Sequence, residues 1–324
     1  MHSQQLGPLW PVSHLTLGGG GIGQVWGATT REEARATVCE AVDQGITLLD
    51  LAPSYGRGEA ERVVGEAFEG SLPDGVRITT KFQLGNPHPS EVRDRILSSL
   101  ERSLDTLHLQ SVDLLFLHSN IIPDDYRYPM GGQDRFATPW GIFSELVRPA
   151  LEELKAQGSI GAWGITGVGV PATVIQALRD EPKPDAVQAV ANLLDSPGSM
   201  RRYAEAARPR ELIEAAVSEN VGVLGIRAVQ AGALTAGFDR ELSSDHPDLR
   251  DFRTAAPFRE LAAREGVDPA FLAHRYALSM PGVDSVVLGV KNRDELQQCL
   301  DAERAGALDD GLIGRIDALG LRED

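Results

Sequence analysis

Four polar residues of this chain have types and positions that suit proton transfer, namely Asp50, Tyr55, Lys81 and His118. Asp50, Lys81 and His118 each end a short apolar run, and Tyr55 follows closely after Asp50. A lysine at the end of an apolar strand is partly buried, which costs free energy unless its ammonium is paired. Taken singly, the other three have ordinary explanations. Asp50 could cap a helix or form a turn, Tyr55 could pack in the core, and His118 could be a hydrogen-bonded polar group.

Together, the four residues match the needs of carbonyl reduction, which delivers hydride to carbon and a proton to oxygen. A free tyrosine has a pKa of about 10 and holds its proton too tightly to be a good acid at neutral pH. A nearby Lys81 ammonium stabilises the phenolate and lowers that pKa, and Asp50 neutralises and orients Lys81. His118 is suited to hydrogen-bond the substrate oxygen. We therefore predict an oxidoreductase with Tyr55 as general acid and base.

The elements that must position these residues alternate regularly along the chain. Apolar runs lie at 15–23, 46–50, 76–81, 112–118, 160–166, 186–190, 221–226 and 285–289. Helical patterns lie at about 30–44, 58–69, 89–107, 142–157, 170–179, 208–219, 255–279 in two pieces, and 292–303. Eight strand–helix units without a linker predict one α/β domain, 1–324, folded as a (β/α)8 TIM barrel. The alternative is a doubly wound open sheet with a second domain.

Local signals support these boundaries. Thr30 and Asp268 precede helical patterns as candidate N-caps, and Gly45 and Gly158 stand where helices should end. In a TIM barrel the active site lies at the carboxyl ends of the strands. Asp50, Lys81 and His118 would then point into one mouth.

The longest connection, 119–141, follows the fourth strand. It contains Tyr126, Tyr128, Phe136 and Trp140. Such a long connection predicts a functional lid and an aromatic-lined pocket, although it is also compatible with a simple insertion.

Composition limits the class of partner. A net charge of −16 disfavours nucleic acid and anionic lipid as partners. The chain has no apolar run long enough to cross a membrane, and Met1–Trp10 lacks the pattern of a secretory signal. Cys39 and Cys299 are far apart, so we expect no disulfide framework, no metal site and a cytoplasmic location.

The run Gly18–Gly23 superficially resembles a dinucleotide-binding fingerprint. In that fingerprint the glycines open a helix directly, whereas residues 24–29 do not continue as one. We therefore expect the run to belong to the first strand and its loop.

The sequence resembles the aldo-keto reductases. Segments 45–56, 78–81 and 112–118 look like that family's second, third and fourth strand signatures, and they carry the expected Asp50, Tyr55, Lys81 and His118. The resemblance extends from about Leu15 to Leu300. It implies reduction of a small aldehyde, ketone or sugar to the alcohol, or the reverse reaction.

The resemblance also implies a cofactor, NADP(H) in preference to NAD(H), bound across the barrel mouth without a Rossmann domain and without a metal. It assigns cofactor binding to Gly23, Asp50, Thr166, Gln188, Arg227, Gly289, Lys291 and Arg293. Thr166 and Gln188 would hold the nicotinamide carboxamide, and Lys291 and Arg293 a 2′-phosphate. Trp26, Tyr55 and His118 are the implied substrate residues.

Three positions depart from the family pattern. Gly167 replaces a common Asn, Ile226 or Arg227 stands where an aromatic ring is frequent, and Glu295 lies where many NADP-preferring members have Arg. An alternative function is therefore a nucleotide-binding, redox-sensing module similar to the family's potassium-channel β-subunits. The physiological substrate and the oligomeric state are not indicated by the sequence.

Overall fold

Eight parallel strands close into a barrel in the computed structural model, which describes residues 1–238 and 240–323. The strands are β3 (Leu15–Gly18), β4 (Leu48–Asp50), β5 (Arg77–Phe82), β6 (Val112–Leu117), β9 (Ile160–Thr166), β10 (Ala186–Val190), β11 (Gly222–Ile226) and β12 (Ser285–Leu288). β12 pairs with β3, in the register Val286 to Leu15, and completes the ring. The predicted TIM barrel is confirmed, and all eight predicted strands contribute to it.

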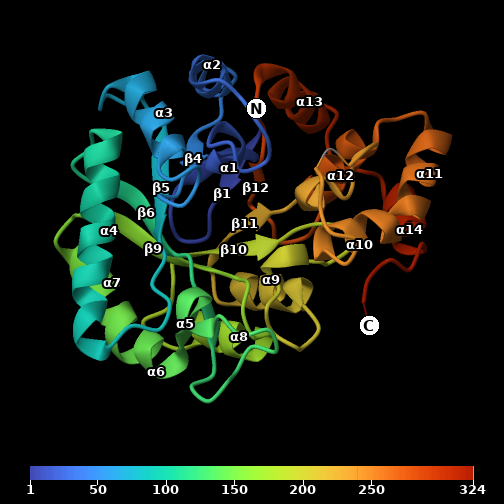
Figure 1. Ribbon diagram of the computed structural model, residues 1–324. Helices are drawn as coiled ribbons and strands as arrows, with labels where there is room; N and C mark the ends of the chain where they lie inside the picture. The colour runs from blue at the N-terminus through green and yellow to red at the C-terminus, as the bar shows by residue number, and fades with distance from the viewer. Residues whose placement is uncertain (239, 324) are drawn as a thin grey trace.

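Helices surround this barrel in chain order, from blue α2 through green α7 to red α13 (Figure 1). The main ones are α2 (Arg31–Asp43), α3 (Glu59–Phe68), α4 (Val92–Leu107), α7 (Arg148–Ala156), α8 (Pro171–Arg179), α9 (Pro209–Ser218), α11 (Ala256–Glu265), α12 (Pro269–Leu278) and α13 (Arg293–Arg304). The Thr30 hydroxyl accepts from Glu33 N at 3.1 Å, and Asp268 accepts from Ala270 N at 2.8 Å, as their N-cap positions predict. Gly45 and Gly158 have φ of 94° and 75°, which suits the ends of helices.

Several elements escaped sequence analysis. They are the hairpin of β1 (Ser3–Gln5) and β2 (Pro11–Ser13), and the helices α10 (Pro247–Thr254) and α14 (Asp310–Asp317). Leu6 and Val12 of the hairpin pack with Leu48, Leu114 and Leu224 inside the barrel. The hairpin thereby closes the amino-terminal end of the barrel, opposite the expected active site.

The glycine run differs from its predicted conformation. The first strand ends at Gly18, and Gly19–Ile22 form a one-turn helix, α1. An ideal Cβ on Gly21 would lie only 1.9 Å from the Val290 carbonyl oxygen, so this turn approaches the loop after β12 too closely for a side chain. A tertiary contact, which local pattern does not reveal, therefore ends the strand early.

The connection 119–141 has a structure of its own. β7 (Asn120–Ile122) and β8 (Ala137–Pro139) pair in parallel, with α5 (Gln133–Phe136) between them. The chain then continues through α6 (Trp140–Ile142) and a π-helix, Phe143–Val147, into α7.

The cysteines and the hydropathy of the helices bear on two further expectations. Cys39 is exposed and Cys299 is buried, and both are free thiols, as expected. In the part of the chain that the structure describes, none of the helices combines the length and the hydropathy needed to span a bilayer.

Candidate active site

The pairing of β4 with β5 brings Asp50 and Lys81 together. Asp50 pairs with Thr79, and Lys81, two residues further along β5, therefore projects on the same side as Thr79. Lys81 Nζ donates to both Asp50 carboxylate oxygens at 2.8 Å and to the Leu51 carbonyl oxygen at 2.7 Å. The side chains of Lys81 and Asp50 are 0% and 3% exposed. All three protons of a fully buried ammonium are thus satisfied.

Asp50 is also fixed from two other directions. Its Oδ1 accepts a hydrogen bond from Thr79 Oγ1 at 3.1 Å and one from Gln188 Nε2 at 2.7 Å. Gln188 lies on β10, so the carboxylate connects separate parts of the barrel wall. The position of Lys81 is consequently set by a network rather than by a single contact.

Tyr55 and His118 complete the predicted group of four. Lys81 Nζ lies 4.8 Å from the centroid of the Tyr55 ring. The Tyr55 and His118 rings meet edge to face, with centroids 5.8 Å apart and an interplanar angle of 89°. Both rings are half-buried and line one cavity together with Asp50. The structure therefore brings all four residues to one place.

Burial raises the pKa of Tyr55 above its ordinary value, the Lys81 ammonium opposes this change, and Asp50 adds to it. The predicted effect of Lys81 has the right sign, but the expected net lowering of the Tyr55 pKa is wrong, because desolvation outweighs it. For Lys81, burial favours the neutral amine, yet the charges of Asp50 and Tyr55 reverse this effect and raise its pKa. Lys81 therefore remains a cation and Tyr55 remains protonated at neutral pH.

The same surroundings lower the pKa of His118, in contrast to those of Tyr55 and Lys81. Burial and the nearby Lys81 charge lower its pKa to about 3. The imidazole is therefore neutral at physiological pH, with one nitrogen carrying a proton and the other able to accept one. Such a ring can orient a substrate oxygen without adding a charge to the site.

Asp50, Tyr55 and His118 line a cavity of about 460 Å³. Its walls include most of the predicted ligand-binding residues, namely Trp26, Asp50, Tyr55, His118, Thr166, Gln188, Arg227, Gly289 and Lys291. The Thr166 hydroxyl is buried and has no hydrogen-bond partner among the described residues. An unpaired buried hydroxyl on a cavity wall is well suited to a ligand, because leaving it unmatched costs free energy.

Gly23 and Arg293 do not belong to the described residues that line this cavity. Gly23 ends the one-turn helix α1. Arg293 forms an ion pair with Glu33 at 2.9 Å on the surface, with 55% of its side chain exposed. Lys291 does face the cavity, where its Nζ lies 3.0 Å from Glu295.

The sequence patterns did not reveal one part of the cavity wall, to which residues 235–237, Arg240 and the helices α12 and α13 contribute. The missed lining residues include Met200, Arg240, His274 and Cys299. Arg227 itself is held by Gln230 at 2.6 Å and Asp248 at 2.8 Å, and the Arg240 guanidinium lies 5.6 Å from the Trp26 ring centroid. The unusual length of the connection between β11 and α10 is the sequence feature that could have indicated this part of the wall.

The aromatic residues of 119–141 do not form the predicted pocket wall. Tyr126, Tyr128 and Phe136 pack in a separate hydrophobic cluster, and Trp140 lies against Phe143. None of these four residues is among the described residues that line the cavity. The prediction that this loop supplies an aromatic pocket wall is therefore wrong. The pairing of β7 with β8 folds the loop onto neighbouring loops instead.

Comparison with known proteins adds independent findings. The model of the Aldo/keto reductase family matches residues 14–320. L-galactose dehydrogenase of Arabidopsis thaliana is 26% identical over 293 residues, which cover 89% of this chain and 83% of that protein. An aldo-keto reductase of Bacillus subtilis is 27% identical over 306 residues, covering 88% and 83%. The solved holo form of an aldo-keto reductase from Bacillus halodurans superposes with a TM-score of 0.73 at 23% identity, covering 98% of this chain and 96% of that chain. This likeness shows that the two chains share a fold.

The depressed pKa of His118 predicts a pH dependence of stability. Between the ordinary value of 6.5 and about 3, the unfolded chain binds a proton that folded His118 does not bind. The free energy of unfolding therefore falls as the pH drops through this window, and His118→Asn should show a shallower fall. Thermal unfolding from pH 7 to pH 4 measures the slope, and nitrogen-15 spectra of labelled histidine should show neutral His118 throughout.

His108→Asn provides the control, because His108 is exposed at the end of α4, where its φ of 59° also suits asparagine. A His118 resonance that titrates near pH 6.5 would contradict the assignment of a neutral ring.

Proposed function

Since this chain belongs to the aldo/keto reductase family, we propose that it interconverts a small carbonyl compound and its alcohol with a nicotinamide dinucleotide as hydride carrier. The observation that carries this proposal is the placement of Tyr55, Asp50 and His118 on one cavity, with the buried Lys81 ammonium paired to Asp50 and next to the Tyr55 ring. A proton donor, a cation that stabilises its conjugate base, and a neutral hydrogen-bonding ring are the groups that this reaction needs.

The cavity has groups that fit such a cofactor. The unpaired Thr166 hydroxyl and the Gln188 amide suit the nicotinamide carboxamide, and Arg227 and Arg240 suit a pyrophosphate. Gly289 leaves room for the Trp26 ring on the cavity wall, since an ideal Cβ there would lie 3.1 Å from Trp26 Nε1. When bound, the nicotinamide would supply or accept the hydride.

In the direction of reduction, the Tyr55 hydroxyl would donate its proton to the substrate oxygen and leave a phenolate. Burial opposes this phenolate, and the adjacent Lys81 ammonium offsets the opposition. Asp50 holds Lys81 in position through two 2.8 Å contacts. In the direction of oxidation, the same phenolate would accept the alcohol proton.

His118 and Trp26 would select and orient the substrate. Neutral His118 would donate a hydrogen bond to the reacting oxygen, and the Trp26 ring would cover an apolar face of the molecule. The Arabidopsis relative carries the name of a sugar dehydrogenase, which supports sugars beside simple aldehydes and ketones as the substrate class.

Tyr55→Phe tests the proton donor. The change removes one hydroxyl and retains the ring, so we expect turnover on a panel of aldehydes, ketones and sugars to fall at least about 100-fold. The dissociation constant of NADPH or NADH, followed by quenching of tryptophan fluorescence, should change little. Steady-state kinetics and this titration together measure the effect.

Tyr128→Phe is the matched control, because Tyr128 is buried but lies in the separate cluster under the 119–141 loop. Wild-type turnover in the Tyr55 variant would contradict the mechanism. Tight nucleotide binding by the wild-type chain with no turnover on the panel would instead favour a redox-sensing module.

Thr166→Val tests the carboxamide contact. The hydroxyl has no partner in the described structure, so its loss should not lower the free energy of unfolding appreciably. It should weaken cofactor binding by about 0.5–1.5 kcal/mol, the typical worth of one hydrogen bond. Denaturant unfolding and fluorescence titration provide the two measurements.

Thr80→Val should give the reverse result, since the Thr80 hydroxyl donates to buried Glu61 at 2.6 Å. We expect lower stability and unchanged cofactor affinity for that control. An unchanged dissociation constant for Thr166→Val would remove this residue from the cofactor site.

Glu295→Gln tests cofactor preference. The Glu295 carboxylate neutralises Lys291 and would repel a 2′-phosphate beside it. The wild-type chain should therefore discriminate weakly between NADPH and NADH, and the variant should bind NADPH several-fold more tightly relative to NADH. Paired titrations measure the ratio of the two dissociation constants.

Asp301→Asn on the same helix is the control, because Asp301 pairs with Arg304 on the surface. An equal ratio in Glu295→Gln and wild type would place the 2′-phosphate, if bound, away from Glu295 and Lys291.

A further inference from the structure

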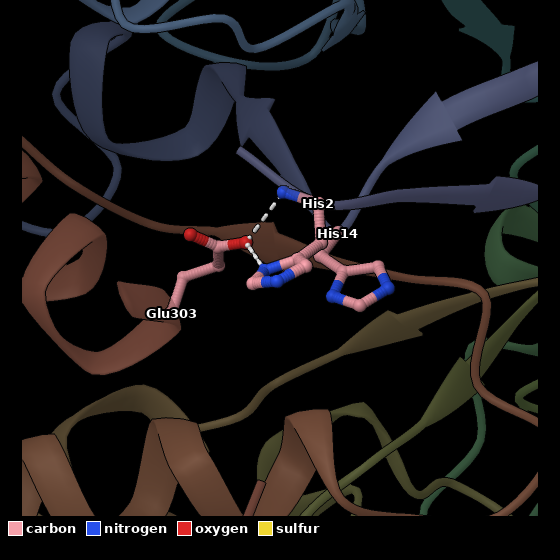
Figure 2. Close-up of side chains that lie close together, drawn as sticks. All are labelled: His2, His14 and Glu303. Carbon is pink, nitrogen blue, oxygen red and sulfur yellow. Dashed lines mark hydrogen bonds and ion pairs between the residues drawn. The ribbon is translucent and has the colours of Figure 1, made fainter. Parts of the chain in front are cut away.

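A second cluster of polar side chains lies at the amino-terminal end of the barrel, away from the cavity. His2 precedes β1 and His14 follows β2, and the β1–β2 register pairs Ser3 with Ser13. The two histidines are therefore cross-strand neighbours, and His14 N donates to the His2 carbonyl oxygen at 3.0 Å. Their rings stack with centroids 5.5 Å apart (Figure 2).

Glu303, near the end of α13, points at this histidine pair (Figure 2). Its side chain is only 3% exposed, and Oε1 lies 2.8 Å from both His2 N and His2 Nδ1. By contrast, no described residue hydrogen-bonds the ring nitrogens of His14, which is itself half-buried. The His14 imidazole therefore has ring nitrogens available to a ligand, and they lie close to the Glu303 carboxylate.

We propose that His2, His14 and Glu303 bind a divalent cation of the zinc class. One ligand atom from each residue can be chosen so that all three lie within 4.8 Å of one another. Zinc holds nitrogen and oxygen ligands at about 2.0–2.2 Å, so the three atoms need to converge by about 1–2 Å. The His2 side chain is 69% exposed and can make this movement. Water would occupy a fourth position.

The donor set determines the class of metal. Imidazole nitrogen suits zinc, copper and nickel, whereas magnesium and calcium prefer oxygen ligands alone. Two imidazoles and one carboxylate therefore select a borderline transition-metal ion over the abundant hard cations. The expectation of no metal site was based on the spacing of the two cysteines. The three proposed ligands are instead two histidines and a glutamate that lie far apart in the sequence.

The position of the site indicates a structural role. The hairpin that carries both histidines also places Leu6 and Val12 in the barrel interior. A metal bound to Glu303 would attach this hairpin to α13 and so hold the closed end of the barrel. The catalytic residues lie at the other end, and the metal would stabilise the fold without entering the reaction.

The test uses full-length protein without a histidine tag, treated with chelator and titrated with zinc chloride at pH 7.5 by calorimetry. We expect one zinc ion per chain and a rise in Tm of a few degrees at saturation. His14→Ala and Glu303→Gln should each weaken zinc binding at least tenfold. His108→Asn, which alters an exposed histidine outside the cluster, should retain wild-type affinity.

His2→Ala provides a further variant that leaves the packed core unchanged, since the His2 side chain is mostly exposed, and it should lose zinc affinity in the same way. Zinc binding that survives His14→Ala and Glu303→Gln would overturn the proposal, because His2 with other nearby donors would then suffice. It would also be overturned by a wild-type Tm that does not respond to zinc, or that rises equally with magnesium.

Discussion

The burial of one ion pair, Lys81 with Asp50, constrains both the barrel and its candidate active site. Moving two opposite charges from water into a protein interior costs several kcal/mol for each ion, which close contact and additional hydrogen bonds must offset. Here Lys81 donates three hydrogen bonds, while Asp50 accepts from Thr79 and Gln188 as well. The partners come from the neighbouring strands β4 and β5 and, through Gln188, from β10, so the full set of contacts joins separate parts of the barrel wall. The geometry of the candidate active site and the fold therefore depend on the same contacts.

The pair also divides acid–base roles among neighbouring groups. Burial keeps His118 neutral and the charge of Lys81 adds to this effect, whereas the same charge partly counters the burial that keeps Tyr55 protonated. Neighbouring titratable groups whose pKa values are driven apart can act as donor, acceptor and fixed charge at a single pH. On the proposed function, the four residues would divide these roles within one proton-transfer site.

Sequence patterns revealed the features that depend on local chemistry. Apolar runs and caps such as Thr30 located the strands and helices, and the polar residue at the end of a run located Asp50, Lys81 and His118. Features set by tertiary contact were not accessible in this way. The early end of β3 depends on Val290, and the orientation of Arg293 depends on Glu33. The folding of Phe136 away from the cavity depends on the pairing of β7 with β8.

The ring of strands has a consequence for synthesis of the chain on the ribosome. One pairing of the ring joins Leu15 to Val286, so β3 and β12 meet only after the roughly 270 residues between them have emerged. Until then, β3 presents an unpaired edge, and the apolar side chains of the amino-terminal hairpin have no complete barrel to fill. Such long-range closure is slow and leaves the nascent chain open to association with other chains. This architecture therefore delays completion of the fold until β12 has been synthesised and gives molecular chaperones an interval in which to act.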